Sequence, residues 1–325
     1  MRRRYVYVWT DAYGNFRSKV RYVSESTPPN WNYDGSSTGQ ATTGQSEIEL
    51  VPIQTYRGGY VLCATYHQDG TPTAQNNYAA FTSELESFLV TAKTRVAFEQ
   101  EFFIYDARTK KPYQYDLWSS ANQGPYYCSV GALGNGFIEK FLTEIFDRAI
   151  DLGIRVTGYN LEVAPAQGEI QVDAYGLRAA HDLTMLRYLM WDTLSAHDLF
   201  PVFDPKPLGP TWNGSGLHTN ISTGLTMGSS GLHEIYRILK ILDETHEKWM
   251  PMLGAGNEKR LTGIHETSSY SRFTWGVGSR DTSVRIPNST ARAGSGYFED
   301  RRPAANADPY VLIRLYAHVL YGLNR

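Results

Sequence analysis

Two glutamates in the stretch VAFEQEFF are the first residues of the chain whose spacing could do chemistry. The stretch is rich in apolar and aromatic residues and predicts a strand, in which successive side chains point to opposite faces. Glu99 and Glu101 would then share one face, and Phe98 and Phe102 the other. Two carboxylates ~7 Å apart on one strand face repel each other unless a cation lies between them. Taken alone, the pattern also fits an edge strand with a solvated acidic face.

Three further segments place acidic or imidazole side chains in similar settings. NLEVAPAQGEIQV carries two glutamates seven residues apart, NGSGLHTN carries a histidine close to glycines, and GYFEDRRP carries a glutamate in an extended run. The candidate metal ligands are therefore Glu99, Glu101, Glu162, Glu169, His218 and Glu299. Five carboxylates and one imidazole suit Mg²⁺ or Mn²⁺ better than Zn²⁺. The irregular spacing of the segments does not by itself establish that the six side chains meet.

Arginines gather in the last quarter of the chain, mostly beside Gly, Ser, Thr or Pro: Arg260, Arg280, Arg285, Arg301 and Arg302. For any one of them a plain surface charge is the simpler interpretation. The run Glu299–Asp300–Arg301–Arg302 is more specific, because strand alternation would form two charge pairs on opposite faces. Guanidinium groups close to a carboxylate-held metal are what phosphoryl transfer requires. The sequence has no Walker-type phosphate loop.

The segment NWNYDGSSTGQ, residues 30–40, is rich in polar side chains and reads as a loop with no helix in it. Its centre, Asp34 followed by Gly35, Ser36 and Ser37, has an ordinary turn composition. Local composition alone gives this segment no function.

The elements that position these residues fall into two parts. The first 76 residues predict strands at 4–11, 18–25 and 58–67, and residues 77–325 predict alternating short strands and helices. In this second part the strands are expected at 95–105, 155–164, 168–172, 216–222 and 282–287, and the helices at 78–94, 135–153, 177–199, 231–249 and 307–323. The chain is therefore expected to be an α+β protein with a small β-rich domain at 1–76 and a larger domain at 77–325.

Bulk properties narrow the class of protein further. The 325 residues carry a formal net charge of −2 and 42% hydrophobic residues, which predicts a globular protein without a field that recruits nucleic acid or an anionic membrane. Cys63 and Cys128 are too few for a disulfide framework or a thiolate metal site. The apolar runs are too short to span a membrane, and the start MRRRYVYVWT reaches an aspartate too early for a signal peptide. A cytoplasmic protein with neither nucleic acid nor membrane as partner is expected.

Taken together, these motifs resemble the glutamine synthetases of the eukaryotic type (class II). The resemblance covers nearly the whole chain in the family's order. It rests on NWNYDGSSTGQA, EQEFF, QGPYYCSVGA, NLEVAPAQGEIQV, FDPKPLGPTWNGSGLHTNIST, NEKRLTGIHETSS and GYFEDRRPAANADPY.

The resemblance implies a fold, an activity and an assembly. The fold would be a β-grasp N-terminal domain (1–76) and a catalytic domain (77–325) with a curved antiparallel sheet flanked by helices. The activity would be ATP-dependent ligation of ammonia to L-glutamate through γ-glutamyl phosphate, giving glutamine, ADP and phosphate. Active sites would form between adjacent subunits of a homo-oligomer, the family's decamer of two stacked pentameric rings.

The resemblance also implies roles for individual residues. Two or three Mg²⁺ or Mn²⁺ ions would be held on the glutamate side by Glu101, Glu162 and Glu169, and at the ATP γ-phosphate by Glu99, His218 and Glu299. Glutamate would be held by Asn213, Gly214, Arg260 and Arg301. The ATP phosphates would contact Arg280 and Arg285, and the nucleotide Ser222 and Tyr297. Glu266 would be a flap residue that shields the acyl phosphate and accepts a proton from ammonia. Asp34 and Ser37 would reach the neighbouring subunit's site, where Asp34 binds and deprotonates ammonium near Tyr127.

The chain departs from the family pattern at several positions. Gly168 stands where tryptophan is usual, which predicts a void or extra backbone freedom beside a ligand. Arg95 replaces an aromatic residue of the adenine pocket. The segment 52–60 is shorter than the family's loop, and residues 75–77 (Gln-Asn-Asn) lack an expected basic residue.

Two other functions stay open at this point. A γ-glutamyl ligase for an amine or polyamine would need a wider loop around Asp34 and Ser37. A non-catalytic structural or regulatory homologue, such as the family's lens relatives, would be favoured by loss of the metal glutamates, and none is lost.

Overall fold

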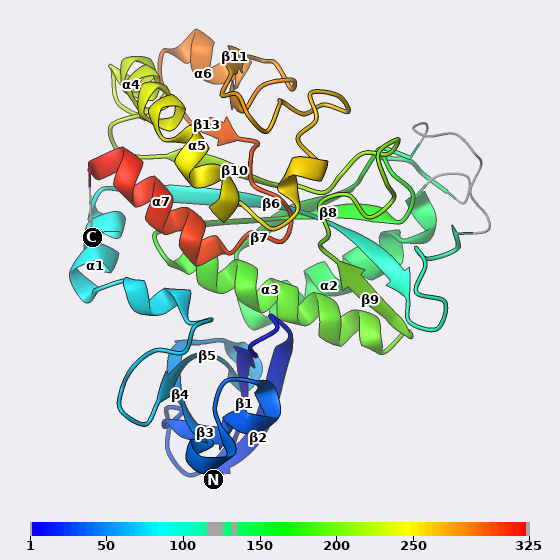
Figure 1. Ribbon diagram of the computed structural model, residues 1–325, viewed down its shortest axis with the longest axis vertical. Helices are drawn as coiled ribbons and strands as arrows, with labels where there is room; N and C mark the ends of the chain where they lie inside the picture. Colours follow the sequence, from blue (N-terminus) through cyan, green and yellow to red (C-terminus); the bar gives the residue numbers. More distant parts are fainter. Residues whose placement is uncertain (1, 116–125, 132–134, 323–325) are drawn as a thin grey trace.

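The structure is a computed structural model that describes residues 2–115, 126–131 and 135–322. Residues 123–125 and 132 of the QGPYYCSVGA motif therefore lie outside the described residues. A first sheet has the strand order β2-β1-β5-β4-β3, with β1 and β5 parallel in its centre (Figure 1). Its strands are β1 Arg3–Thr10, β2 Phe16–Val23, β3 Trp31–Asp34, β4 Glu47–Thr55 and β5 Tyr60–His67. This is the β-grasp sheet that the resemblance implies.

The prediction that residues 30–40 form a loop is wrong for the first half of the segment. Trp31–Asp34 form β3, which pairs antiparallel with β4 and buries Tyr33 in the sheet's apolar cluster. The next four residues, Gly35–Thr38, form one 3₁₀ turn that the Asp34 side chain caps by accepting from the Ser36 backbone N–H. A four-residue strand of alternating aromatic and polar residues is too short for its periodicity to stand out beside a strong turn signal.

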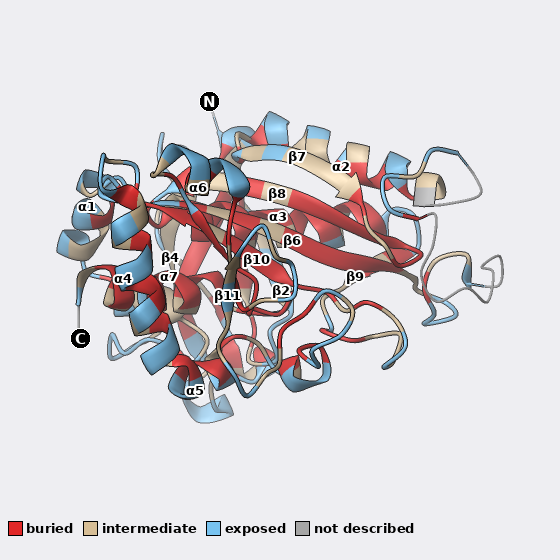
Figure 2. Cartoon of the chain, turned by 90° about the horizontal axis from the view of Figure 1, so that it is seen from above, coloured by how far each residue is buried: buried red, intermediate tan, exposed pale blue. Residues whose placement is uncertain are grey.

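The second sheet has the order β11-β12-β13-β10-β6-β8-β7, and β9 pairs with the far end of β6. It curls into a half-barrel, and most residues of its long central strands β6 and β8 are buried (Figure 2). Its strands are β6 Arg95–Asp106, β7 Val156–Leu161, β8 Gln167–Tyr175, β9 Leu199–Val202, β10 Leu217–Ser222, β11 Trp275–Val277, β12 Val284–Ile286 and β13 Phe298–Asp300. The five strands predicted for this part of the chain are confirmed.

In the described part of the chain, seven helices accompany this sheet: α1 Ser83–Thr91, α2 Glu139–Leu152, α3 Arg178–Ser195, α4 Gly231–Glu244, α5 His246–Trp249, α6 Asn288–Ala293 and α7 Pro309–Tyr321. All of them except α6 lie at the five predicted places. The single helix expected at 231–249 is wrong, because it divides at Thr245, whose hydroxyl donates to the Ile241 carbonyl at 2.7 Å. Such back-bonding competes with the helix ladder. The first helix begins only at Ser83, because Thr82 caps it by accepting from the Leu85 N–H.

One face of the second sheet is apolar and the helices cover it. Phe98 and Phe102 of β6 are fully buried there, together with most of α3 and much of α2 and α7. In Figure 1 these helices lie on the side of the sheet that faces the β-grasp sheet. The two sheets are joined through α3, where the Tyr56 hydroxyl donates to Asp182 at 3.0 Å. The opposite face of β6, β8, β10 and β13 is left for polar side chains.

The void expected beside Gly168 is not present. Gly168 pairs with Phe102 on β6 and with Leu161 on β7, in the middle of the sheet. A Cβ on this residue would lie 2.6 Å from Cδ2 of the fully buried Leu142 on α2. Leu142 therefore fills the space that a larger side chain would need.

We expect Gly168→Ala to lower the free energy of unfolding by about 1–3 kcal/mol, since overpacking a close-packed core costs this much. Chemical denaturation of the wild type, Gly168→Ala, Leu142→Ala and the double variant would measure it. The cost of Gly168→Ala should shrink in the Leu142→Ala background, because the clashing Cδ2 is gone. An equal cost in both backgrounds would contradict the account.

Candidate active site

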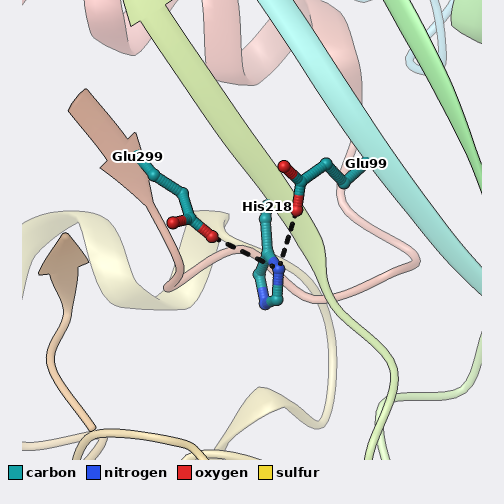
Figure 3. Close-up of side chains that lie close together, drawn as sticks. All are labelled: Glu99, His218 and Glu299. Carbon is teal, nitrogen blue, oxygen red and sulfur yellow. Dashed lines mark hydrogen bonds and ion pairs between the residues drawn. The ribbon is translucent and has the colours of Figure 1, made fainter. Parts of the chain in front are cut away.

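The six predicted metal ligands lie around one polar cavity of ≈170 Å³ on the polar face of the second sheet. They form two groups, within each of which the ligand atoms lie within 4.8 Å of one another: Glu101, Glu162 and Glu169, and Glu99, His218 and Glu299. Figure 3 shows the second group, with the His218 Nδ1 3.3 Å from Glu99 Oε2 and 3.6 Å from Glu299 Oε1. These are the two groupings that the family resemblance implies.

Strand register brings the two groups together. On β6, Glu99 lies opposite His218 of β10, while Glu101 lies opposite Glu169 of β8. Because Glu99 and Glu101 are two residues apart, both point to the same face, and one strand serves both groups. On the outer side of β10, the partner of Asn220 is Glu299 of β13.

Ionisation of the carboxyl groups in this cavity is unfavourable unless a cation lies between them. Burial raises the pKa of Glu101 to about 8, and the carboxylate of Glu162 adds to the rise. Burial likewise raises the pKa of Glu162 to about 7, and it raises the pKa of Glu169 well above its ordinary value. Burial and nearby arginines hold the pKa of His218 well below its usual range, so the imidazole is neutral. Oxygen donors of this density and one neutral imidazole fit a hard divalent cation such as Mg²⁺ or Mn²⁺.

Amide side chains orient these carboxylates, and the sequence reading missed them. Asn160 Nδ2 donates to Glu162 Oε1, Gln171 Nε2 to Glu169 Oε1, and Asn220 Nδ2 to Glu99 Oε1, each at 2.8 Å. Asn160 and Gln171 each stand two residues from the glutamate that they hold, on the same strand face. An amide two residues from a candidate ligand is the signal that could have found them.

Arg260 lies buried beneath the cavity because two glycines leave room for it. A Cβ on Gly214 would lie 2.9 Å from the Arg260 Cγ, and one on Gly216 would lie 2.6 Å from its Nη2. This Nη2 lies 3.2 Å from the His218 Nε2 and donates to the Arg301 carbonyl at 3.0 Å. Arg260 thus links the glycine turn to His218, one of the candidate metal ligands. Asn213 and Gly214 line the cavity beside it.

The two charge pairs expected from Glu299–Arg302 are confirmed. Arg301 Nη1 donates to Glu299 Oε1 at 2.7 Å on the cavity face, where Arg285 is also paired with Glu299. On the other face Arg302 Nη2 donates to Asp300 Oδ2 at 2.7 Å, and both side chains are fully buried. Of the four residues, Glu299 and Arg301 therefore line the cavity, while Asp300 and Arg302 form an ion pair inside the core.

The segment His265–Thr267, which is the predicted flap, lines one side of the cavity. His265 and Glu266 both have left-handed backbones, with φ of 56° and 59°, a conformation that is uncommon for non-glycine residues. Arg301 holds the flap by donating from Nη2 to the Glu266 carbonyl at 3.2 Å. The Glu266 carboxylate accepts from Arg280 Nη1 at 3.1 Å across the opening, and Tyr127 lines the same cavity.

Four of the predicted residues lie outside this cavity. Ser222 and Tyr297 line a second, adjoining cavity of ≈290 Å³ that also touches Glu99. Asp34 and Ser37 lie at the end of β3 in the β-grasp sheet, and neither belongs to the described residues that line the two cavities. Asp34 accepts hydrogen bonds from the Ser36 and Ser37 hydroxyls, which hold the pKa of this exposed carboxyl below its ordinary value.

Comparison with known proteins agrees with this geometry. The family model for the glutamine synthetase catalytic domain matches residues 86–325. The chain belongs to the glutamine synthetase family. A glutamine synthetase of Panulirus argus is 39% identical, over 94% of this chain and 90% of its own length. One of Emericella nidulans is 36% identical, over 97% and 92%.

Solved structures share the fold of this glutamine synthetase family member. The Plasmodium falciparum glutamine synthetase superposes with a TM-score of 0.74 at 18% identity, over 99% of this chain and 73% of that one. In the described part of the chain, no helix combines the length and apolar character that crossing a membrane requires.

The raised pKa values make stability depend on pH and on cations. A glutamate with a folded-state pKa of about 8 and an ordinary pKa of 4.5 stabilises the fold below pH 4.5 and loses this contribution as the pH rises toward 8. The contribution of these carboxyl groups to the stability of the metal-free protein should therefore fall as the pH rises toward 8. The net fall should be clearest above about pH 6.5, because the lowered pKa values of the buried His181, His218 and His246 give an opposite contribution below it. A divalent cation needs the deprotonated carboxylates, so the stabilisation that it provides should grow over the same range.

Thermal unfolding with chelator and with Mn²⁺, at several pH values, would measure both effects. The control variant is Glu258→Gln, which removes an exposed glutamate outside both cavities and should leave both the pH effect and the Mn²⁺ effect unchanged. Equal Mn²⁺-induced shifts in the unfolding midpoint at all pH values would contradict a site made of Glu101, Glu162 and Glu169.

The amide partners give a second prediction. Gln171→Ala should weaken Mn²⁺ binding about 10- to 100-fold, because it removes the donor that orients Glu169. Isothermal titration calorimetry on the folded variant measures the change. Gln171→Glu places a further carboxylate beside Glu169 and should not restore the wild-type affinity, since the lost group is a donor. Wild-type affinity in Gln171→Ala would show that Glu169 needs no support.

Proposed function

We propose that this protein ligates ammonia to L-glutamate with ATP, through γ-glutamyl phosphate, to give glutamine, ADP and phosphate. The observation that carries the proposal is the pair of metal-ligand groups around one cavity, with Arg260, Arg285 and Arg301 on its walls and Glu266 over its opening. Two adjacent cation sites flanked by guanidinium groups are suited to stabilising charge on a transferring phosphoryl group. The proposal is further supported by the family to which the chain belongs.

The cations would be held by the two groups of ligands. Glu101, Glu162 and Glu169 would bind those on the glutamate side, and Glu99, His218 and Glu299 the one at the ATP γ-phosphate. Bound Mg²⁺ or Mn²⁺ supplies Lewis-acid stabilisation of negative phosphoryl and carboxylate oxygens. His218 suits this role because its imidazole is neutral, so the Nδ1 that faces Glu99 and Glu299 can offer a lone pair in the tautomer that carries the proton on Nε2.

The substrates would be held by neighbouring parts of the same cavity. Asn213 and Gly214 would contact the amino acid, and Arg260 and Arg301 would neutralise its carboxylates. Arg280 and Arg285 would contact the phosphates, since both residues line the cavity. Ser222 and Tyr297 in the adjoining cavity would contact the nucleotide. Because these contacts lie along one face of the sheet, they would place the carboxylate of glutamate in line with the γ-phosphate that it attacks.

Glu266 would protect the acyl phosphate from water and accept a proton from the attacking ammonia. Its carboxylate pairs with Arg280 at 3.1 Å, and both side chains are half-exposed. A phosphoryl group would compete for Arg280 and leave the Glu266 carboxylate for the ammonia. The left-handed backbone at His265 and Glu266 keeps this side chain turned over the cavity.

Asp34 would act in a neighbouring subunit's site, where it binds ammonium and eases its deprotonation near Tyr127. Its hydroxyl donors Ser36 and Ser37 keep it ionised, which suits cation binding. Because Asp34 lies at the tip of the β-grasp sheet, a neighbouring subunit is required to bring it to a cavity. A homo-oligomer, in the family's form a decamer of two pentameric rings, with domains at 1–76 and 77–325, completes the proposal. A cytoplasmic location stays a prediction.

Two alternatives are weaker. A γ-glutamyl ligase for a larger amine or polyamine would need an open pocket, but hydrogen bonds tie the Ser36 and Ser37 hydroxyls to Asp34 and keep this turn compact. A non-catalytic homologue would not retain six converging ligands with their amide donors.

Phosphate release from ATP and glutamate, measured with Mg²⁺ or Mn²⁺ and either ammonium or a panel of amines, tests the reaction. Ammonium should give the highest kcat/KM, and glutamine should form in equal amount to phosphate. No release with ammonium from a folded and assembled sample would refute the proposal. Higher kcat/KM with an amine would favour the alternative ligase.

Subunit mixing tests whether sites are shared between chains. Asp34→Ala and Glu266→Ala homo-oligomers should each form little glutamine. If each site combines Glu266 of one chain with Asp34 of the next, randomly mixed rings should regain activity at about one quarter of their sites. Native mass spectrometry would verify mixing. Mixed rings without regained activity would contradict the placement of Asp34 in a neighbouring site.

A further inference from the structure

A third and larger cavity lies between the β-grasp sheet and the helices of the second sheet. Its volume is ≈550 Å³, within the range of about 300–1,000 Å³ that is usual for small-molecule sites. The β-grasp sheet contributes Trp9 and Phe16 to its lining, and α3 contributes Arg187 and Trp191. None of the described residues that line it lines either of the other two cavities, so it is separate from the candidate active site.

Two of the departures from the family pattern contribute to this cavity. Ile53 belongs to the segment 52–60, which is shorter than the family's loop, and residues 75–77 lack an expected basic residue. Ile53 and all three residues of 75–77 line the cavity. Its lining therefore includes residues for which the family resemblance implies no role, and Arg187 is the one basic side chain among its described residues.

The positive charge of Arg187 has only neutral hydrogen-bond acceptors around it. Its Nε donates to Gln100 Oε1 at 2.7 Å, its Nη1 to the Ala307 carbonyl at 3.0 Å and its Nη2 to the Ala305 carbonyl at 2.8 Å. Since a guanidinium group has five N–H donors, one on each Nη atom is left without an acceptor in the described part of the chain. The side chain is only partly buried and lines the cavity, so a ligand there can reach these donors.

The one acidic residue among the described lining residues, Asp308, is compensated by its own contacts. Its Oδ1 accepts from the backbone N–H groups of Tyr310 and Val311 at the start of α7, and its Oδ2 accepts from Asn77 Nδ2 at 2.8 Å. A helix N-terminus stabilises a carboxylate in this position. Burial lowers the pKa of Arg187 to about 10, and the charge of Asp308 opposes this shift only in part. Arg187 is thus cationic at neutral pH, and the cavity favours an anion.

The rest of the lining favours an aromatic ligand. Trp191 is 40% exposed and Tyr13 is 77% exposed, and both line the cavity together with Trp9 and Phe16. Trp191 is held in place by stacking on Phe200, with ring centroids 5.8 Å apart. A ring that enters the cavity would remove exposed aromatic surface from water and pack against these side chains.

We propose that this cavity binds a small monocarboxylate with an aromatic body, whose carboxylate accepts from the remaining N–H groups of Arg187 while its ring packs against Trp191. The ligand is not a substrate of the proposed reaction. Gln100, to which Arg187 donates, points to the face of β6 opposite to Glu99 and Glu101, because successive strand residues alternate. The proposal is therefore independent of the proposed function.

Three probe compounds separate the charge from the ring. Calorimetry on the assembled protein would measure the Kd of phenylpropionate, of its neutral analogue phenylpropionamide and of propionate, which lacks the ring. Saturating Mg²⁺ and L-glutamate would keep the probes from the arginines of the active-site cavity. The wild type should bind phenylpropionate about 10-fold more tightly than either other compound, because it alone has both the charged hydrogen bonds and the buried ring.

Two variants place the probe in this cavity. Arg187→Met should weaken phenylpropionate binding about 10-fold and leave phenylpropionamide binding unchanged, since it removes the charge at similar side-chain length. Trp191→Ala should weaken phenylpropionate binding about 10-fold as well. Trp275→Ala is the matched control, because Trp275 is 46% exposed, packs against one aromatic ring and lies outside the described lining of all three cavities. It should leave the Kd unchanged.

Thermal unfolding would verify that each variant is folded. Arg187 also contributes hydrogen bonds to the core, so the comparison of phenylpropionate with its amide in the wild type tests the charge even without Arg187→Met. Equal binding of acid and amide by the wild type would overturn the recognition of a carboxylate. Equal losses in Trp191→Ala and Trp275→Ala would overturn the placement in this cavity. No phenylpropionate binding by an assembled sample that forms glutamine would overturn the proposal and leave the proposed function intact.

Discussion

Repulsion between buried carboxylates is the constraint on which the rest of this structure depends. Glu101, Glu162 and Glu169 lie with their oxygens within 4.8 Å of one another, and burial raises the pKa of each. A fold keeps such a group ionised only with cations or donors around it. Three features stabilise the ionised carboxylates. They are the arginines beneath and beside the cavity, the amide donors on its strands and the proposed divalent cations.

The curved sheet meets the requirement by using both faces of the same strands. On β6 the side chains of Phe98 and Phe102 anchor the strand in a dry core, which fixes the opposite direction of Glu99 and Glu101. On β13 the same alternation divides Glu299 from Asp300. Because apolar packing sets the register, the positions of the ligands are set by residues that never touch a substrate. Gly214 and Gly216 contribute in a different way, because their lack of a side chain leaves room for Arg260.

Part of this site could be predicted from the sequence, because successive side chains of a strand alternate between its two faces. The shared face of Glu99 and Glu101, and the two charge pairs of Glu299–Arg302, follow from a period of two. The pairing of β6 with β10 and of β10 with β13 does not follow from it, because each joins strands that lie far apart in the chain. The resemblance to a family supplied it. Strand β3 was missed because a turn signal outweighed its short pattern, and the division between α4 and α5 at Thr245 leaves no mark in the apolar periodicity. The filling of the Gly168 site by Leu142 is equally non-local.

The central claim is that two adjacent groups of ligands hold divalent cations close together on one sheet face. Electron paramagnetic resonance of Mn²⁺ bound to the assembled protein tests it most directly, because neighbouring Mn²⁺ ions couple magnetically. At least two Mn²⁺ per chain should bind, since there are two groups of ligands, and their spectra should show coupling that Glu101→Gln abolishes. A single, uncoupled Mn²⁺ per chain at saturation would contradict the account.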